Sequence, residues 1–159
     1  MNNLIETLEG KNPAYSNRYR GIMEKYAMVG GNAEKLKEET GRFFSNAYEF
    51  YMYAASIGMR KEYRLPLSGE TSTAWNVKNW RPVDIVHYLL MGLLDKSGID
   101  FNEFEDMTHE QASSVTTSLR IALEEYANGG FDMIQSKLKE DPYYFDNEYG
   151  FVQFLKELK

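Results

Sequence analysis

The sequence predicts an all-α fold, a single compact domain of about five to seven helices spanning residues 1–159. Three observations support this prediction. At least five segments repeat apolar residues every three or four positions, which is the period of one helix face. Between these segments, Gly, Pro and Asn stand where helices typically begin or end. With 159 residues, 43% of them apolar, the chain is large enough to bury a core of its own.

The N-terminal part predicts a short element followed by an amphipathic helix. Residues 1–14 end at an Asn-Pro turn signal and are expected to form a short helix or a loose arm. Residues 15–29 place their apolar side chains on one helical face, which predicts a helix. The glycine pair at 30–31 is expected to stop that helix, and Asn32 can cap a short helix after it.

Residues 43–59 predict the most deeply buried helix of the chain. Two apolar stripes cover nearly its whole circumference, a pattern typical of a central helix. Small residues gather in its C-terminal half at Ala54, Ala55, Ser56 and Gly58. We therefore expect another helix to pack closely against this half.

The segment from 60 to 80 lacks helical period and contains Pro66, Gly69 and a Ser/Thr cluster. These residues predict a long connection that allows a small β-hairpin. A structureless segment of this length is uncommon in compact domains and is often functional. Helix is expected to resume at Arg81-Pro82 and to end at Gly98.

The C-terminal half predicts a long helix, a break and two further helices. Thr108 and Gln111 form the spacing of a capping box, which marks a helix start. The sequence Asn-Gly-Gly at 128–130 is expected to interrupt this helix before it continues. Asp141-Pro142 ends the continuation, and residues 147–158 predict a final amphipathic helix.

Charge and composition narrow the functional classes. The net charge of −6 is uneven, since residues 1–81 carry 12 Lys and Arg against 9 Asp and Glu, and residues 82–159 carry 6 against 15. The acidic half argues against a general nucleic-acid coat. No membrane segment and no secretion signal are recognisable, and the chain has no cysteine. A cytoplasmic protein is therefore expected.

Motifs for catalysis, metals and cofactors are not recognisable. The acidic run Asp95–Asp106 resembles a calcium loop, but no register gives both the turn glycine and the terminal bidentate acid. His87 and His109 lack the spacing of a zinc motif, and core or surface positions are expected for both. The glycine pairs lack nucleotide-binding context. The sequence therefore predicts no catalytic residue, no cofactor and no metal.

A stretch of interleaved basic and aromatic residues is the strongest candidate for binding. Arginine with aromatic side chains can hold phosphates, stack on bases or anchor a protein interface. Three interpretations remain open: a packed loop with solvated charges, a binding surface that favours protein over nucleic acid, or a small-ligand or catalytic pocket. The candidate partner- or nucleic-acid-binding residues are Arg60, Lys61, Tyr63, Arg64, Trp75, Lys78, Trp80 and Arg81.

Two segments carry a family resemblance. Phe43–Leu67 combines an aromatic-rich Ala-Ala helix, a glycine, a basic cluster and Pro-Leu, and Glu124–Ile134 contains the unusual string EEYANGG. Together they resemble Dnd system-associated protein 4, a group of small accessory proteins encoded beside bacterial DNA phosphorothioation loci. The two segments cover a little under a quarter of the chain. The resemblance implies an accessory role in a prokaryotic DNA-modification or phage-defence system, beside larger nuclease or ATPase partners. It implies no catalytic residue.

The leading functional hypothesis is a non-enzymatic accessory protein that binds a larger protein partner of such a system. The alternative is a DNA-binding module that uses the 60–81 segment, for which only weak binding is expected because Glu62 and Glu70 oppose its five cations. A third, weaker hypothesis is a small nuclease or hydrolase with dispersed acidic residues. No membrane partner is expected, and the sequence leaves the oligomeric state open.

Overall fold

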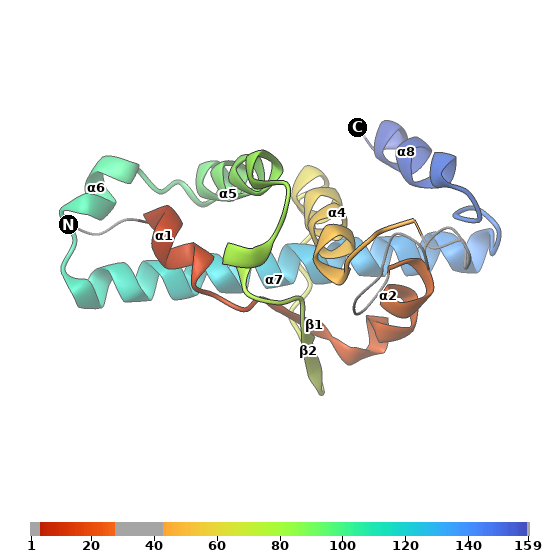
Figure 1. The fold of residues 1–159 in the computed structure, drawn as a ribbon, viewed down its shortest axis with the longest axis horizontal. Helices are drawn as coiled ribbons and strands as arrows, with labels where there is room; N and C mark the ends of the chain where they lie inside the picture. Colours follow the sequence, from red (N-terminus) through yellow and green to blue (C-terminus); the bar gives the residue numbers. More distant parts are fainter. Residues whose placement is uncertain (1–3, 28–42, 159) are drawn as a thin grey trace.

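The structure, a computed structural model, describes residues 4–27 and 43–158 (Figure 1). The helix stop expected at 30–31 and the cap expected at Asn32 lie outside the described residues. Seven α-helices are present in the described part of the chain, which confirms the all-α prediction. They are α1 Leu4–Glu9, α2 Arg20–Tyr26, α4 Ala47–Arg60, α5 Val83–Ser97, α6 Phe101–Glu105, α7 His109–Glu140 and α8 Glu148–Glu157.

The long helix α7 organises the molecule. It spans 32 residues, which corresponds to about 48 Å at 1.5 Å per residue. Figure 1 shows α4, α5 and α8 along one side of α7, while α2 and a small sheet lie on the other side. The core between these layers includes Phe50, Tyr51, Phe131 and Leu93, all fully buried. No described helix combines the length and the apolar character needed to cross a bilayer.

Helices α4 and α7 cross at backbone contact through glycines. A Cβ atom on Gly130 would overlap with the carbonyl oxygen of Ala54, and one on Gly58 would overlap with the carbonyl oxygen of Tyr126. The close packing expected of the small residues in α4 is therefore found. The interruption expected at 128–130 is wrong, because α7 continues through these residues. Gly130 leaves room for α4 to cross α7, and Gly129 leaves room for the Tyr63 backbone; neither glycine ends the helix.

The strands pair across a long sequence separation. Strand β1, Ala14–Ser16, and strand β2, Thr71–Thr73, are antiparallel, with Ala14 opposite Thr73. A hairpin within 60–80 is not formed, because the partner of β2 comes from the N-terminal segment. For the same reason the helix expected from residue 15 begins later. Residues 14–16 form β1, a 3₁₀ turn covers Asn17–Tyr19, and α2 starts at Arg20.

Buried polar side chains on α7 hold β1 in place. The Glu124 carboxylate accepts a hydrogen bond from the Ala14 N–H at 2.8 Å and pairs with Arg120 at 2.7 Å. Asn128 accepts from the Ser16 N–H at 3.0 Å and donates to the Ser16 hydroxyl at 2.9 Å. These bonds satisfy backbone groups that the short sheet alone would leave unpaired. The N-terminal segment is thereby fastened to the core.

Most local helix signals appear as expected. Gly98 ends α5 in the left-handed conformation, with φ 68°. The capping box at Thr108 and Gln111 is formed in both directions, and α7 ends immediately before Asp141. Pro82 is the N-cap of α5 rather than its first residue. The acidic run after Gly98 contains the short helix α6, capped by the Asp100 side chain.

Candidate functional site

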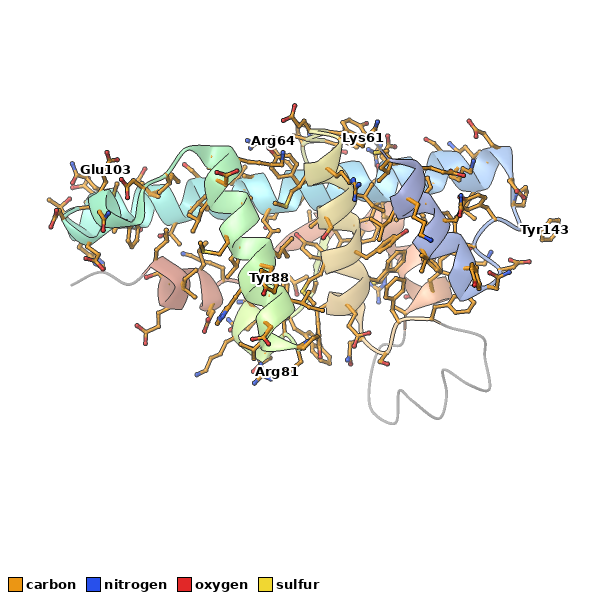
Figure 2. All side chains as sticks on the ribbon, turned by 90° about the horizontal axis from the view of Figure 1, so that it is seen from above. Lys61, Arg64, Arg81, Tyr88, Glu103 and Tyr143 are labelled. Atoms are coloured by element: carbon orange, nitrogen blue, oxygen red, sulfur yellow. The ribbon has the colours of Figure 1, made fainter. Side chains whose placement is uncertain are left out.

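The eight candidate residues divide into two groups at opposite ends of the α4–α5 pair. Figure 2 places Lys61 and Arg64 at the end where α4 finishes, and Arg81 at the end where α5 begins. We call the first group the α4-end cluster: Arg60, Lys61, Tyr63 and Arg64. We call the second group the α5-start cluster: Trp75, Lys78, Trp80 and Arg81. The structure therefore divides the single predicted segment into two separate groups.

The α4-end cluster is held in place by backbone hydrogen bonds to α4 and to α7. After α4 ends at Arg60, the chain turns at Glu62, which has a positive φ of 53°. The Tyr63 N–H donates to the Gly58 carbonyl at 2.8 Å, and the Leu65 N–H donates to the Glu125 carbonyl at 3.0 Å. These hydrogen bonds fix the backbone of the basic segment against α7.

Side chains of α7 also bind the cluster. The Arg64 Nε atom lies 3.0 Å from Glu125 Oε1, and its guanidinium lies 5.5 Å from the centre of the Tyr126 ring. The Tyr63 hydroxyl donates to Asp132 Oδ2 at 2.7 Å. Arg60 and Lys61 are exposed at the end of α4. The arrangement displays cations to solvent on a rigid aromatic and acidic support.

Asp132 accepts hydrogen bonds from two tyrosines. Tyr19 donates to Oδ1 at 3.1 Å, while Tyr63 donates to Oδ2. Burial, followed by the Asp132 charge, raises the pKa of Tyr19 from 10.0 to about 12. The hydrogen bond to Asp132 also raises the pKa of Tyr63. Both hydroxyls are therefore held neutral, as donors that link α4 and the N-terminal segment to α7.

This raised pKa predicts a loss of stability in alkali. The pKa of Tyr19 is raised in the folded state. The contribution of Tyr19 to stability is therefore complete below pH 10 and is lost as the pH rises through 12. We expect the free energy of unfolding to fall by about 2 kcal/mol across this window because of Tyr19. Urea unfolding between pH 8 and 11.5 measures it. Tyr19→Phe should show a shallower decline, and an equal decline in both proteins would contradict the assignment.

The α5-start cluster is partly core. Trp80 is only 1% exposed, its Nε1 donates to the Ala74 carbonyl at 2.7 Å, and its ring stacks on Tyr48. Arg81 donates to the carbonyls of Lys78 and Trp80 at 2.9 and 2.8 Å. Trp75 is 46% exposed and has a φ of 69°, which is unusual for a tryptophan.

A cavity of about 260 Å³ lies beside this group. Its lining includes Lys78, Trp80 and Arg81, together with Glu9 and His87. Glu9 Oε1 and His87 Nε2 are 3.5 Å apart. The lining thus contains basic and acidic side chains together with the aromatic ring of Trp80.

The two segments that carry the family resemblance face each other in the fold. Gly58, Tyr63 and Arg64 from the first contact Tyr126, Gly129 and Glu125 from the second. A family model described as DNA sulphur modification system-associated protein 4 matches residues 25–154. The chain belongs to this family.

Two other comparisons add nothing to the family match. A search of curated proteins and a search of solved structures each returned no match. The match to the DNA sulphur modification system-associated protein 4 family includes α4 to α7 entire, together with both candidate clusters.

In the described part of this family member, the histidines and acidic residues form no cluster that could hold a metal ion. Among residues 4–27 and 43–158, no group of three or more His, Asp or Glu side chains is placed to hold an ion. His87 pairs with Glu9, and His109 is exposed in the first turn of α7. The acidic residues between Asp95 and Asp106 are exposed around α6.

Sequence reasoning missed an exposed apolar face of this family member, on α5. Val83, Ile85, Tyr88 and Met91 are all exposed there. A signal was available, because apolar residues occupy every side of the helix between 83 and 94 although only one side can face the core. Exposed apolar residues that lie together commonly mark interaction surfaces.

Proposed function

We propose that this chain is a non-enzymatic accessory protein of a cytoplasmic DNA-modification or phage-defence system, and that it binds a larger protein partner. The family description associates its members with a DNA sulphur modification system. The observation that carries the proposal is the α4-end cluster. It presents Arg60, Lys61 and Arg64 on a segment fixed to α7. An acidic surface of the partner would complement these cations.

The chemistry of the cluster supports binding rather than catalysis. The acidic side chains beside it, Glu125 and Asp132, are used in bonds to Arg64, Tyr19 and Tyr63. These carboxylates serve as the support of the surface. Exposed arginines on a fixed support are a common feature of protein interfaces, since little side-chain and loop freedom is then lost on binding.

DNA binding through the same cations is the alternative. Arg60, Lys61 and Arg64 could contact phosphates, but Glu62 and Glu125 lie among them and reduce the local positive charge. Few phosphates would be neutralised, so affinity would be weak and would fall further with salt. We expect duplex and single-stranded DNA to remain unbound near physiological salt.

Reversing two charges of the cluster tests the proposal. Arg60→Glu with Arg64→Glu should reduce capture of the partner by at least about tenfold, because two attractive contacts become repulsive. The experiment is affinity capture of the tagged chain from a host that carries the modification system. The melting temperature should change little, since an exposed ion pair such as that of Arg64 contributes about 1 kcal/mol or less.

The matched control is Lys139→Glu with Lys156→Glu, which changes the net charge equally at two exposed positions on α7 and α8. It should capture the partner as the wild type does. Equal capture by all three proteins would refute the proposed surface. Retention of DNA at physiological salt by the wild type, lost in the Arg60 and Arg64 variant, would favour the alternative.

A further inference from the structure

The outer side of α5 is apolar at its centre. Tyr88 is 77% exposed, and Ile85 and Met91, three residues to either side, are 52% and 48% exposed. Figure 2 looks onto this side and shows Tyr88 near the middle of the helix. Tyrosine is one of the residue types that commonly dominate the binding energy of an interface, and such residues lie near its centre.

A groove runs beside these residues between α4 and α5. Its volume is about 270 Å³, and its walls are Met52, Ser56 and Met59 from α4 with Ile85, Tyr88 and Leu89 from α5. Gly92 lets α5 approach Met59 closely, because a Cβ there would lie 3.1 Å from the Met59 methyl group. The face therefore offers both a ridge and an adjoining hollow.

Charges are arranged symmetrically about Tyr88. Arg81 lies two residues before α5, separated from it by Pro82, and Asp95 lies near the end of the helix; each is seven residues from Tyr88 in the sequence. Seven residues are close to two helical turns, so Tyr88 and Asp95 share one stripe of α5. Figure 2 places Arg81 at the beginning of the helix. Arg81 is thus exposed at one end of this face and Asp95 at the other, where Lys96 beside it pairs with Glu62 at 3.5 Å.

We propose that this face binds a second copy of the chain, with the two α5 helices antiparallel about a twofold axis at Tyr88. In this arrangement Tyr88 meets its own counterpart, Ile85 meets Met91, and Arg81 meets Asp95 at both ends. A twofold interface requires this kind of self-complementarity. The groove receives side chains of the opposing α5.

Orientation follows from the charges. A parallel pair would place Arg81 against Arg81 and Asp95 against Asp95, which is repulsive, whereas the antiparallel pair makes two attractive contacts. Antiparallel helices also bring opposite ends of their dipoles together. Arg81 gives one guanidinium nitrogen to the carbonyls of Lys78 and Trp80, and its remaining donors are left for a carboxylate.

Exchanging the charges tests both the surface and its orientation. Sedimentation of the wild type between about 1 and 100 μM should show a dimer, and Arg81→Asp or Asp95→Arg alone should weaken it by about tenfold or more, because each variant places like charges together twice. A mixture of the two variants should form heterodimers of near wild-type affinity, since both contacts are then attractive. Failure of the mixture to associate while the wild type dimerises would overturn the antiparallel arrangement.

Two further variants make the outcome decisive. Tyr88→Glu should give a monomer whose melting temperature equals that of the wild type at concentrations where the wild type is also monomeric, because the side chain is mostly exposed. Tyr88→Cys should be joined to its copy by a short bifunctional maleimide, since the chain has no other cysteine. Ser113→Cys, exposed on α7, is the matched control and should not be joined. A monomeric wild type, or a dimer that survives Tyr88→Glu, would overturn the proposal. The variants leave Arg60, Lys61 and Arg64 intact, so partner capture is scored separately.

Discussion

Replacing Gly130 by alanine is expected to lower the free energy of unfolding by at least about 3 kcal/mol. The added methyl group would overlap with the backbone carbonyl of Ala54, so α4 and α7 would have to move apart along their whole crossing. Backbone cannot change rotamer to make room, unlike a flexible side chain. For a chain of this size the melting temperature should fall by about 6 to 12 °C.

Gly21→Ala is the matched control. Gly21 lies in α2, and a Cβ there would have no neighbour within 4 Å. Alanine is the better helix former, so this variant should equal or slightly exceed the wild type in stability. If Gly130 merely ended a helix in open space, Gly130→Ala would be as harmless as the control. That result would contradict the crossing of α4 and α7.

Asn128→Leu is expected to destabilise the fold by about 2 to 4 kcal/mol. Asn128 is 0% exposed and satisfies both the N–H and the hydroxyl group of Ser16. Leucine has a similar volume but leaves the buried Ser16 N–H unpaired, which costs about 1 to 3 kcal/mol. It also removes the hydrogen bonds from the Asn128 amide to the Ser16 hydroxyl and the Pro66 carbonyl. The strand β1 should then detach first, which amide hydrogen exchange of residues 14–16 can measure.

Asn79→Leu serves as the control for this change, because Asn79 is exposed at the end of the 3₁₀ turn Val77–Asn79. Its free energy of unfolding should differ from that of the wild type by no more than an ordinary surface substitution causes, about 0.5 kcal/mol either way. Equal stability of Asn128→Leu and Asn79→Leu would show that the buried network contributes nothing to the fold.

The glycines of α7 show why local reasoning recovered part of this fold. Helix starts and ends depend on neighbouring residues, so the cap at Thr108 and the stop at Gly98 could be predicted. The effect of Gly130 depends on Ala54, which is distant in sequence and adjacent in space. In isolation an Asn-Gly-Gly string favours a helix end. Packing against another helix outweighs that preference, and a single sequence does not reveal the neighbour.

The sheet and the candidate site show the same limit. Strand β2 pairs with β1 because residues 14 and 73 lie opposite each other in the fold. No local sequence pattern indicates this contact. The basic and aromatic residues were found by composition, but their division into two clusters follows from the parallel course of α4 and α5. The burial of Trp80 likewise depends on Tyr48 and Ala74. Composition identified the residues, and the fold determines which of them a partner can reach.

Chemical footprinting of the captured complex tests the proposed function most directly. The tagged chain, alone and with its partner bound, is treated with reagents that modify exposed lysine and arginine side chains, and each site is quantified by mass spectrometry. We predict that Arg60, Lys61 and Arg64 become protected on binding, while Lys139 and Lys156 stay reactive. Protection confined to Lys139 and Lys156, with the α4-end cluster as reactive as in the free chain, would contradict the account.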